Sequence, residues 1–114
     1  MSGISTHVLD TSIGRPASGV RVVLEVHSAG KDWKVVGKGK TDADGRVASL
    51  LPTGAHLEPV NYRLTFDVSS YFRAQKVASF YSEVSILFAV RDAAQHYHIP
   101  LLLSPYGYTT YRGS

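Results

Sequence analysis

Two histidines stand two positions apart in an apolar run near the end of the chain, HYHIPLLLSPYGYTTYRGS (96–114). In an extended strand, His96 and His98 point to the same face, because side chains alternate with a period of two. Neutral imidazole is the side chain best matched to general-base chemistry near pH 7. The alternate positions form the better core face: Tyr97, Ile99, Leu101 and Leu103. We therefore predict that the two histidines face outward from a sheet, toward solvent or a partner subunit.

Other polar residues can complete a site with these histidines. His7 lies in a second predicted strand, ISTHVLD, and Arg46 follows an Asp-Gly turn that projects its side chain from a rigid base. The chain closes with Tyr-Arg-Gly-Ser (111–114), a composition that suits an anchored end lining a polar site better than a frayed tail. We predict that His7, Arg46 and His98 converge with this tetrapeptide. There they can activate water and stabilise an oxyanion at an amide or lactam carbon. Since no serine or cysteine lies in a nucleophile-elbow motif, water is the expected nucleophile.

Plainer interpretations of the same residues compete with this one. A lone histidine on a strand is more often structural than catalytic, and an Asp-Gly-Arg turn is common. His96 and His98 can instead be two metal ligands, since alternate strand positions present both imidazoles together. Because the chain has no cysteine and this motif has no carboxylate, no metal is expected. Weak adventitious metal binding at the pair stays open.

The elements that must hold these side chains are strands. Period-two alternation of apolar residues marks residues 20–26, 62–68 and 84–90, and Gly, Pro and Asp-Gly turns separate them. Many short strands at this spacing predict an all-β, two-sheet antiparallel sandwich. One segment breaks the pattern: residues 69–76 begin with serine and end with lysine, which predicts a short helix with a serine N-cap.

Length and composition describe an ordinary globular protein. The 114 residues are expected to form one domain, 1–114, and 44% of them are hydrophobic while 18% are charged. The lack of cysteine excludes disulfides and thiolate zinc sites. No apolar run is long enough to span a bilayer, and the first ten residues do not resemble a signal peptide. A cytoplasmic location is expected, and whether an export or targeting segment was trimmed stays open.

The net charge of +3 arises from scattered basic residues without an arginine-rich helix or an aromatic stacking motif. Nucleic acid and membrane are therefore not expected partners. A modest attraction for a small anion fits the charge.

Several separated motifs, in order along almost the whole chain, resemble the transthyretin family. These motifs are THVLDTSIGRPASGVRVVLEV, TDADGR, SSYFRA, FYSEV and HYHIPLLLSPYGYTTYRGS. Within that family, His98 and the ending YRGS look like the 5-hydroxyisourate hydrolases, which are also called transthyretin-like or transthyretin-related proteins. Hormone-carrying transthyretins share LLSPY with this chain but lack that histidine and that ending.

The resemblance implies a transthyretin-like (prealbumin-like) sandwich with one short helix, assembled as a homotetramer from two dimers with active sites at the dimer–dimer interface. It also implies a single hydrolase domain that needs no cofactor. That domain would open 5-hydroxyisourate to 2-oxo-4-hydroxy-4-carboxy-5-ureidoimidazoline in urate degradation. The implied catalytic residues are His7, Arg46, His98 and Ser114. Substrate binding is implied for His7, Arg46, Tyr111, Arg112, Gly113 and Ser114. Either histidine can be the base on this interpretation, and the sequence does not assign which.

Two other classes of protein fit the same fold. One is a transthyretin-type protein that holds a hydrophobic hormone-like ligand without catalysis, although a hydrogen-bonding channel disfavours such a ligand. The other is a structural adhesion module, for which a monomer is expected and the outward His98 face has no explanation.

Overall fold

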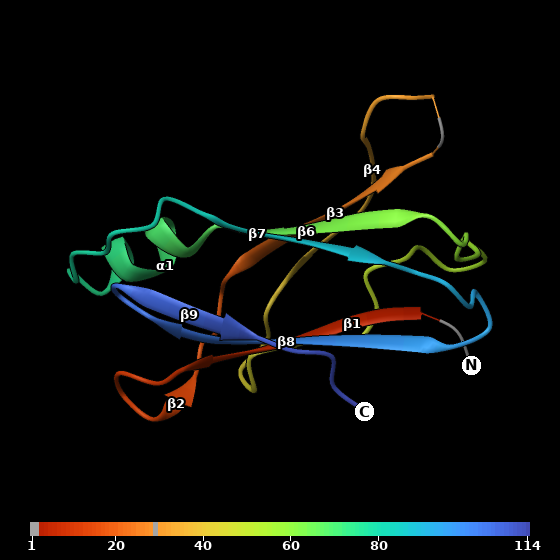
Figure 1. Ribbon diagram of the computed structural model, residues 1–114. Coiled ribbons are helices and arrows are strands. Elements are labelled where there is room, and N and C mark those ends of the chain that lie inside the picture. Colours follow the sequence, from red (N-terminus) through yellow and green to blue (C-terminus); the bar gives the residue numbers. More distant parts are fainter. Residues whose placement is uncertain (1–2, 29) are drawn as a thin grey trace.

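Two β-sheets pack face to face, and one short helix closes an end of the sandwich (Figure 1). The computed structural model describes residues 3–28 and 30–114. In chain order the elements are β1 (Gly3–Asp10), β2 (Arg15–Pro16), β3 (Arg21–His27), β4 (Lys34–Lys40), β5 (Arg46–Val47), β6 (Asn61–Phe66), α1 (Val68–Ala74), β7 (Val84–Ala89), β8 (His96–Ser104) and β9 (Gly107–Thr110). The two-sheet sandwich with one short helix is confirmed.

Strand pairing follows the predicted architecture with one exception. The first sheet has the order β2-β1-β8-β9, with β5 also paired to β1, and the second has the order β4-β3-β6-β7. The pair β1–β8 is parallel, from Gly3 opposite His96 to Asp10 opposite Leu103, whereas the other named pairs are antiparallel. An all-antiparallel arrangement was wrong for this pair. Alternation of apolar residues fixes which face of a strand is buried but not the direction of its neighbour.

The predicted core faces are confirmed. The inward positions of β3 and β6 are buried, and so is the predicted core face of β8: Tyr97, Ile99, Leu101 and Leu103. Because β8 alternates with a period of two, burial of this set turns His96 and His98 to the outer face of the first sheet.

The helix is close to its predicted position but begins with a different cap. Its N-cap is Asp67, whose carboxylate accepts a hydrogen bond from the Ser70 backbone N–H at 3.2 Å, so the predicted serine cap was wrong. The helix starts one residue earlier than predicted because Val68 and Phe72 share a buried face. Both Asp and Ser are good caps, and tertiary burial selects between them.

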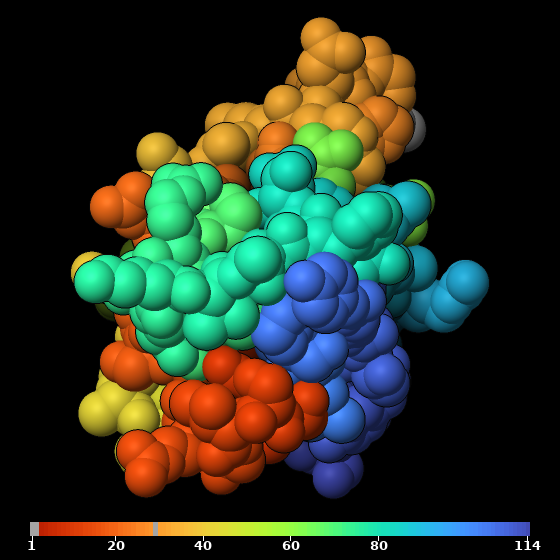
Figure 2. All heavy atoms as spheres, turned by 90° about the vertical axis from the view of Figure 1, so that its left-hand side faces the viewer, coloured from red at the N-terminus to blue at the C-terminus, as the bar shows by residue number. Residues whose placement is uncertain are grey.

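A partly buried hydrogen bond docks α1 against the first sheet. The Tyr71 hydroxyl donates to Asp10 Oδ2 at 2.8 Å, and Asp10 is 1% exposed. Burial, followed by the Asp10 carboxylate, raises the pKa of Tyr71 to about 12, so the phenol stays a donor. In Figure 2, α1 (green) lies beside the N-terminal hairpin (red) and the β8–β9 hairpin (blue). Within residues 3–28 and 30–114, no helix has the length and apolar character needed to cross a membrane.

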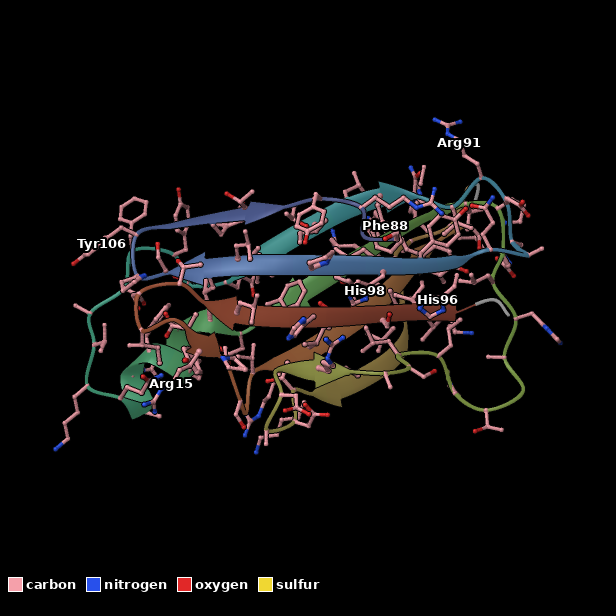
Figure 3. The ribbon with its side chains drawn as sticks, turned by 90° about the horizontal axis from the view of Figure 1, so that it is seen from below. Arg15, Phe88, Arg91, His96, His98 and Tyr106 are labelled. Atoms are coloured by element: carbon pink, nitrogen blue, oxygen red, sulfur yellow. The ribbon has the colours of Figure 1, made fainter. Side chains whose placement is uncertain are left out.

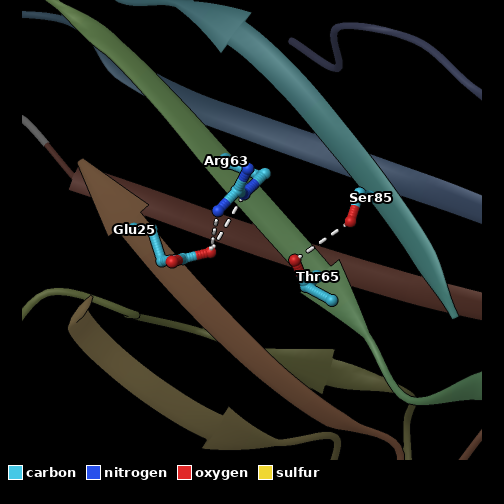
Figure 4. A network of polar contacts seen from close by, with 4 residues as sticks. All are labelled: Glu25, Arg63, Thr65 and Ser85. Carbon is cyan, nitrogen blue, oxygen red and sulfur yellow. Dashed lines mark hydrogen bonds and ion pairs between the residues drawn. The ribbon is translucent and has the colours of Figure 1, made fainter. Parts of the chain in front are cut away.

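The outer face of the second sheet uses its polar residues structurally. Arg63 Nη2 lies 2.9 Å from Glu25 Oε1, and its guanidinium stacks 4.3 Å from the Trp33 ring centroid. A hydrogen bond of 3.2 Å joins the hydroxyl groups of Thr65 and Ser85 on the same face (Figure 4). Arg63 on this face is therefore held by protein partners.

Candidate active site

His96 and His98 lie on one side of β8, next to β1 (Figure 3). The parallel register places Gly3 opposite His96 and Ser5 opposite His98. The Ser5 hydroxyl oxygen lies 2.8 Å from His96 Nε2 and 2.8 Å from His98 Nδ1, so one hydroxyl joins the two rings. This leaves Nε2 of His98 as the ring nitrogen available to a substrate. Sequence reasoning missed Ser5, because alternation of apolar residues does not show which strand lies beside β8.

The C-terminal tail is anchored at His98. The Gly113 backbone N–H donates to the His98 carbonyl at 2.8 Å, and the two residues form an isolated β-bridge. A Cβ added to Gly113 would lie 2.6 Å from Cδ2 of the His98 ring. Only a residue without a side chain allows this close approach. The tail therefore packs on the imidazole and leaves Ser114 beside it, as an anchored end requires.

A rigid turn presents Arg46. The Asp42 carboxylate accepts backbone hydrogen bonds from Asp44 and Arg46, both at 2.9 Å, and these bonds, that from Arg46 foremost, lower the pKa of Asp42. Gly45 has φ 77°, and a Cβ there would lie 2.3 Å from the Val8 carbonyl oxygen, so the turn needs glycine at this position. Arg46 itself is exposed.

These elements bring residues from distant parts of the chain into one cleft. It has a volume of about 290 Å³ and is lined by Ser5, Thr6, Arg46, Val47, Ala48, His96, His98 and Ser114. His7 lies next to it as the β-strand partner of Arg46 and is half-buried. The predicted meeting of His98, Arg46 and the end of the chain is thus present within a single chain.

The electrostatics of the cleft favour a neutral imidazole. Burial lowers the pKa of His98, and the positive charges of Arg46, His7 and His96 lower it further. A histidine with a lowered pKa is unprotonated at neutral pH and can accept a proton. An exposed guanidinium beside it offers a planar fork for an oxyanion or for a urea-like edge.

The first half of the tetrapeptide lies elsewhere. Arg112 donates to the Gln95 side-chain oxygen at 2.8 Å, and its guanidinium stacks 4.4 Å from the Tyr97 ring centroid. With Tyr111 it lines a second cleft of about 370 Å³ between the sheets, beside Ile86 and Phe88. In one chain the tetrapeptide is therefore divided between two clefts, with Gly113 and Ser114 in contact with the His98 site.

Metal ligation was the alternative use considered for the histidine pair. In the described parts of the chain, no three His, Cys, Asp or Glu side chains gather so that they could hold a metal ion. The two ring nitrogens that face one another both contact the Ser5 hydroxyl. The side-chain groups that this cleft offers to chemistry are imidazole, guanidinium and hydroxyl.

Comparison with known proteins agrees with the motifs. The model of the HIUase/Transthyretin family matches residues 4–113. The chain belongs to this family. A probable 5-hydroxyisourate hydrolase of Caenorhabditis elegans is 46% identical over 99% of this chain and 82% of that protein. Membership of the family, as the sequence motifs indicated, is confirmed.

Solved structures of the family share the fold of this member. The 5-hydroxyisourate hydrolase of Klebsiella pneumoniae superposes with a TM-score of 0.86 at 35% identity, covering 99% of this chain and all of that one. Sea bream transthyretin in complex with thyroxine superposes with a TM-score of 0.90 at 28% identity, covering 97% and 94%. The transthyretin-like sandwich is confirmed. Backbone similarity does not separate the two branches of the family, whereas sequence identity is higher to these hydrolases.

Proposed function

We propose that this family member is a single-domain hydrolase that opens the ring of 5-hydroxyisourate to a carboxylated imidazoline. The observation that carries the proposal is the cleft in which His98, Arg46 and Ser114 meet from three separate segments. Higher identity to the hydrolases than to the thyroxine-binding transthyretin supports it as well.

The proposed chemistry assigns a role to each group. Nε2 of His98 takes a proton from water as the water oxygen bonds to the ring carbonyl carbon. Arg46 stabilises the oxyanion that develops there. When the C–N bond breaks, the leaving nitrogen receives that proton, and the new carboxylic acid ionises. His7, beside Arg46, orients the substrate, and Ser114 positions it through its hydroxyl.

A direct assay tests the activity. Freshly prepared 5-hydroxyisourate decays spontaneously, so its ultraviolet absorbance is followed with and without protein at equal pH and buffer concentration. Decay accelerated in proportion to protein concentration supports the proposal. Equal rates would overturn it and would favour a binding protein without catalysis.

The pH profile is the first specific prediction. Protonation of His98 removes the base, and the pKa of His98 lies below its usual value of 6.5, so the base stays neutral to lower pH. The acid limb of kcat/KM is therefore expected to have its midpoint below 6.5. Steady-state rates at constant ionic strength measure it. A midpoint above 6.5 would contradict His98 as the base.

Assembly is the second prediction, and we propose a homotetramer formed by two dimers. Strands β7 and β9 end their respective sheets, and the edge region bears exposed apolar side chains, such as Leu87 at 62% and Tyr106 at 70% exposure. Pairing these edges with a second copy satisfies the open backbone groups. Two such dimers then face each other through the outer faces of their first sheets, where His98 lies, and enclose the active sites between them. In this assembly Tyr111 and Arg112 complete the binding surface. Light scattering should give four times the 12.4 kDa chain mass, and a monomer would contradict this.

A further inference from the structure

The Ser5 hydroxyl between two imidazoles constrains where protons sit in the cleft. Ser5 is 8% exposed, and its oxygen lies 2.8 Å from Nδ1 of His98 and 2.8 Å from Nε2 of His96. A hydroxyl has one proton to donate and two lone pairs to accept with, and a neutral imidazole carries one N–H. Its one proton can go to one ring at most: the hydroxyl either donates to one ring and accepts from the other, or accepts an N–H from both. The tautomers of the two rings are therefore coupled.

Two of these arrangements place the Ser5 proton between the rings. In the first, His98 Nδ1–H donates to Ser5 and the Ser5 hydroxyl donates to His96 Nε2, which leaves a lone pair on His98 Nε2. In the second, both bonds run the other way, and His98 Nε2 carries the proton. The first arrangement alone provides a base toward the cleft. When His98 Nε2 gains a proton in that arrangement, its Nδ1–H bond to Ser5 strengthens and the positive charge is stabilised along the chain of bonds.

We propose that Ser5 and His96 are positioning residues that hold His98 in its Nδ1–H tautomer, so that Nε2 faces the substrate as the base. This inference rests on the proposed hydrolase function. Although both residues line the cleft, their role in this proposal is to set the orientation and tautomer of the His98 ring. The same logic orients the histidine of a hydrolytic triad, with a neutral Ser–His pair in place of a carboxylate.

The surroundings of the pair support this assignment. His96 is exposed, and its ring packs against the backbone of β1 at Gly3. A Cβ at Gly3 would lie 3.2 Å from its Nδ1. The titratable and charged groups that act on His98 from neighbouring elements are Arg46 of β5, His7 of β1 and His96 of β8, and Ser114 lines the same cleft. The Nε2 of His96 points at the Ser5 oxygen, so its lone pair can accept the Ser5 proton.

Tautomer and turnover are measured together in the test. Ring ¹⁵N chemical shifts of His98 are recorded without substrate in the full-length protein, and kcat is measured for Ser5→Ala, Ser5→Thr and His96→Ala. Ser5→Ala should lower kcat by about 10-fold, the scale of an outer hydrogen-bond partner, and shift His98 toward the Nε2–H tautomer. Ser5→Thr keeps the hydroxyl and should recover most of kcat. Ser85→Ala, which removes a hydroxyl from the outer face of the other sheet (Figure 4), is the matched control and should keep the wild-type rate.

A double variant separates positioning from a general structural role. Without the Ser5 hydroxyl, the hydrogen bonds that join His96 to His98 are lost. His96→Ala should therefore lower kcat as a single variant but cause no further loss in the Ser5→Ala background. Additive losses, or wild-type kcat with unchanged ¹⁵N shifts in both single variants, would overturn the proposal. Should Ser5→Ala fail to fold, the His96→Ala variant, whose replaced side chain is exposed, still tests the proposal through the ring ¹⁵N chemical shifts of His98. A wild-type protein without hydrolase activity would overturn the proposed function instead, while the tautomer measurement would stand.

Discussion

Replacing His98 with asparagine is expected to lower kcat/KM for 5-hydroxyisourate by about 10³-fold, within the range for loss of a general base. The asparagine amide can keep the contact to Ser5 that Nδ1 makes, but it has no basic nitrogen at the Nε2 position. The loss should therefore fall on the chemical step rather than on folding. Steady-state rates from the absorbance assay, together with a thermal melt of each variant, measure both.

His56→Asn is the control for this substitution, because His56 is exposed and lies outside the His98 cleft. It should keep the wild-type rate. His7→Asn separates the two candidate bases. If this variant changes KM but keeps the acid limb of the pH profile of kcat/KM, His7 orients the substrate and is not the base. If His98→Asn kept more than a tenth of the rate while His7→Asn lost it, His7 would be the base. If both kept full rate, the hydrolytic mechanism would be wrong.

Replacing Arg46 with methionine is expected to lower kcat by about 10²-fold, as for removal of an oxyanion-stabilising donor. The turn before Arg46 is held by backbone bonds to Asp42 and by Gly45, and the arginine side chain is exposed. Truncation should therefore leave the fold intact. Arg46→Lys keeps the charge but not the planar fork, so its rate should lie between those of the wild type and the methionine variant.

The division between kcat and KM shows how Arg46 acts. A loss in kcat means that the guanidinium contacts the transition state more strongly than the substrate, whereas a rise in KM with unchanged kcat means uniform binding. The second result would contradict the oxyanion role. Arg73→Met, an exposed arginine in the last turn of α1, is the matched control and should leave both constants unchanged.

Much of the architecture could be predicted from the chain because burial and alternation are local properties. A period of two in β3, β6 and β8 fixes which side chains enter the core, so the outward direction of His98 followed from Leu101 and Leu103 being inward. The Asp-Gly turn before Arg46 could also be predicted from the sequence, because its backbone conformation, with a positive φ at Gly45, favours residues of these types. The family motifs extended this reasoning to the candidate site.

The partners across the sheet could not be predicted. Nothing local to HYHIPLLL specifies that β1 lies beside it in parallel, and this pairing alone brings Ser5 between two imidazoles more than ninety positions away. The contacts of the C-terminal residues could not be predicted either. Gly113 packs on His98, and this places Arg112 against Gln95 and Ser114 in the cleft. The sequence by itself determined the strands, their buried faces and the kinds of chemistry available. Tertiary structure decided which groups meet, because long-range pairing depends on the free energy of the whole sandwich and not on any one segment.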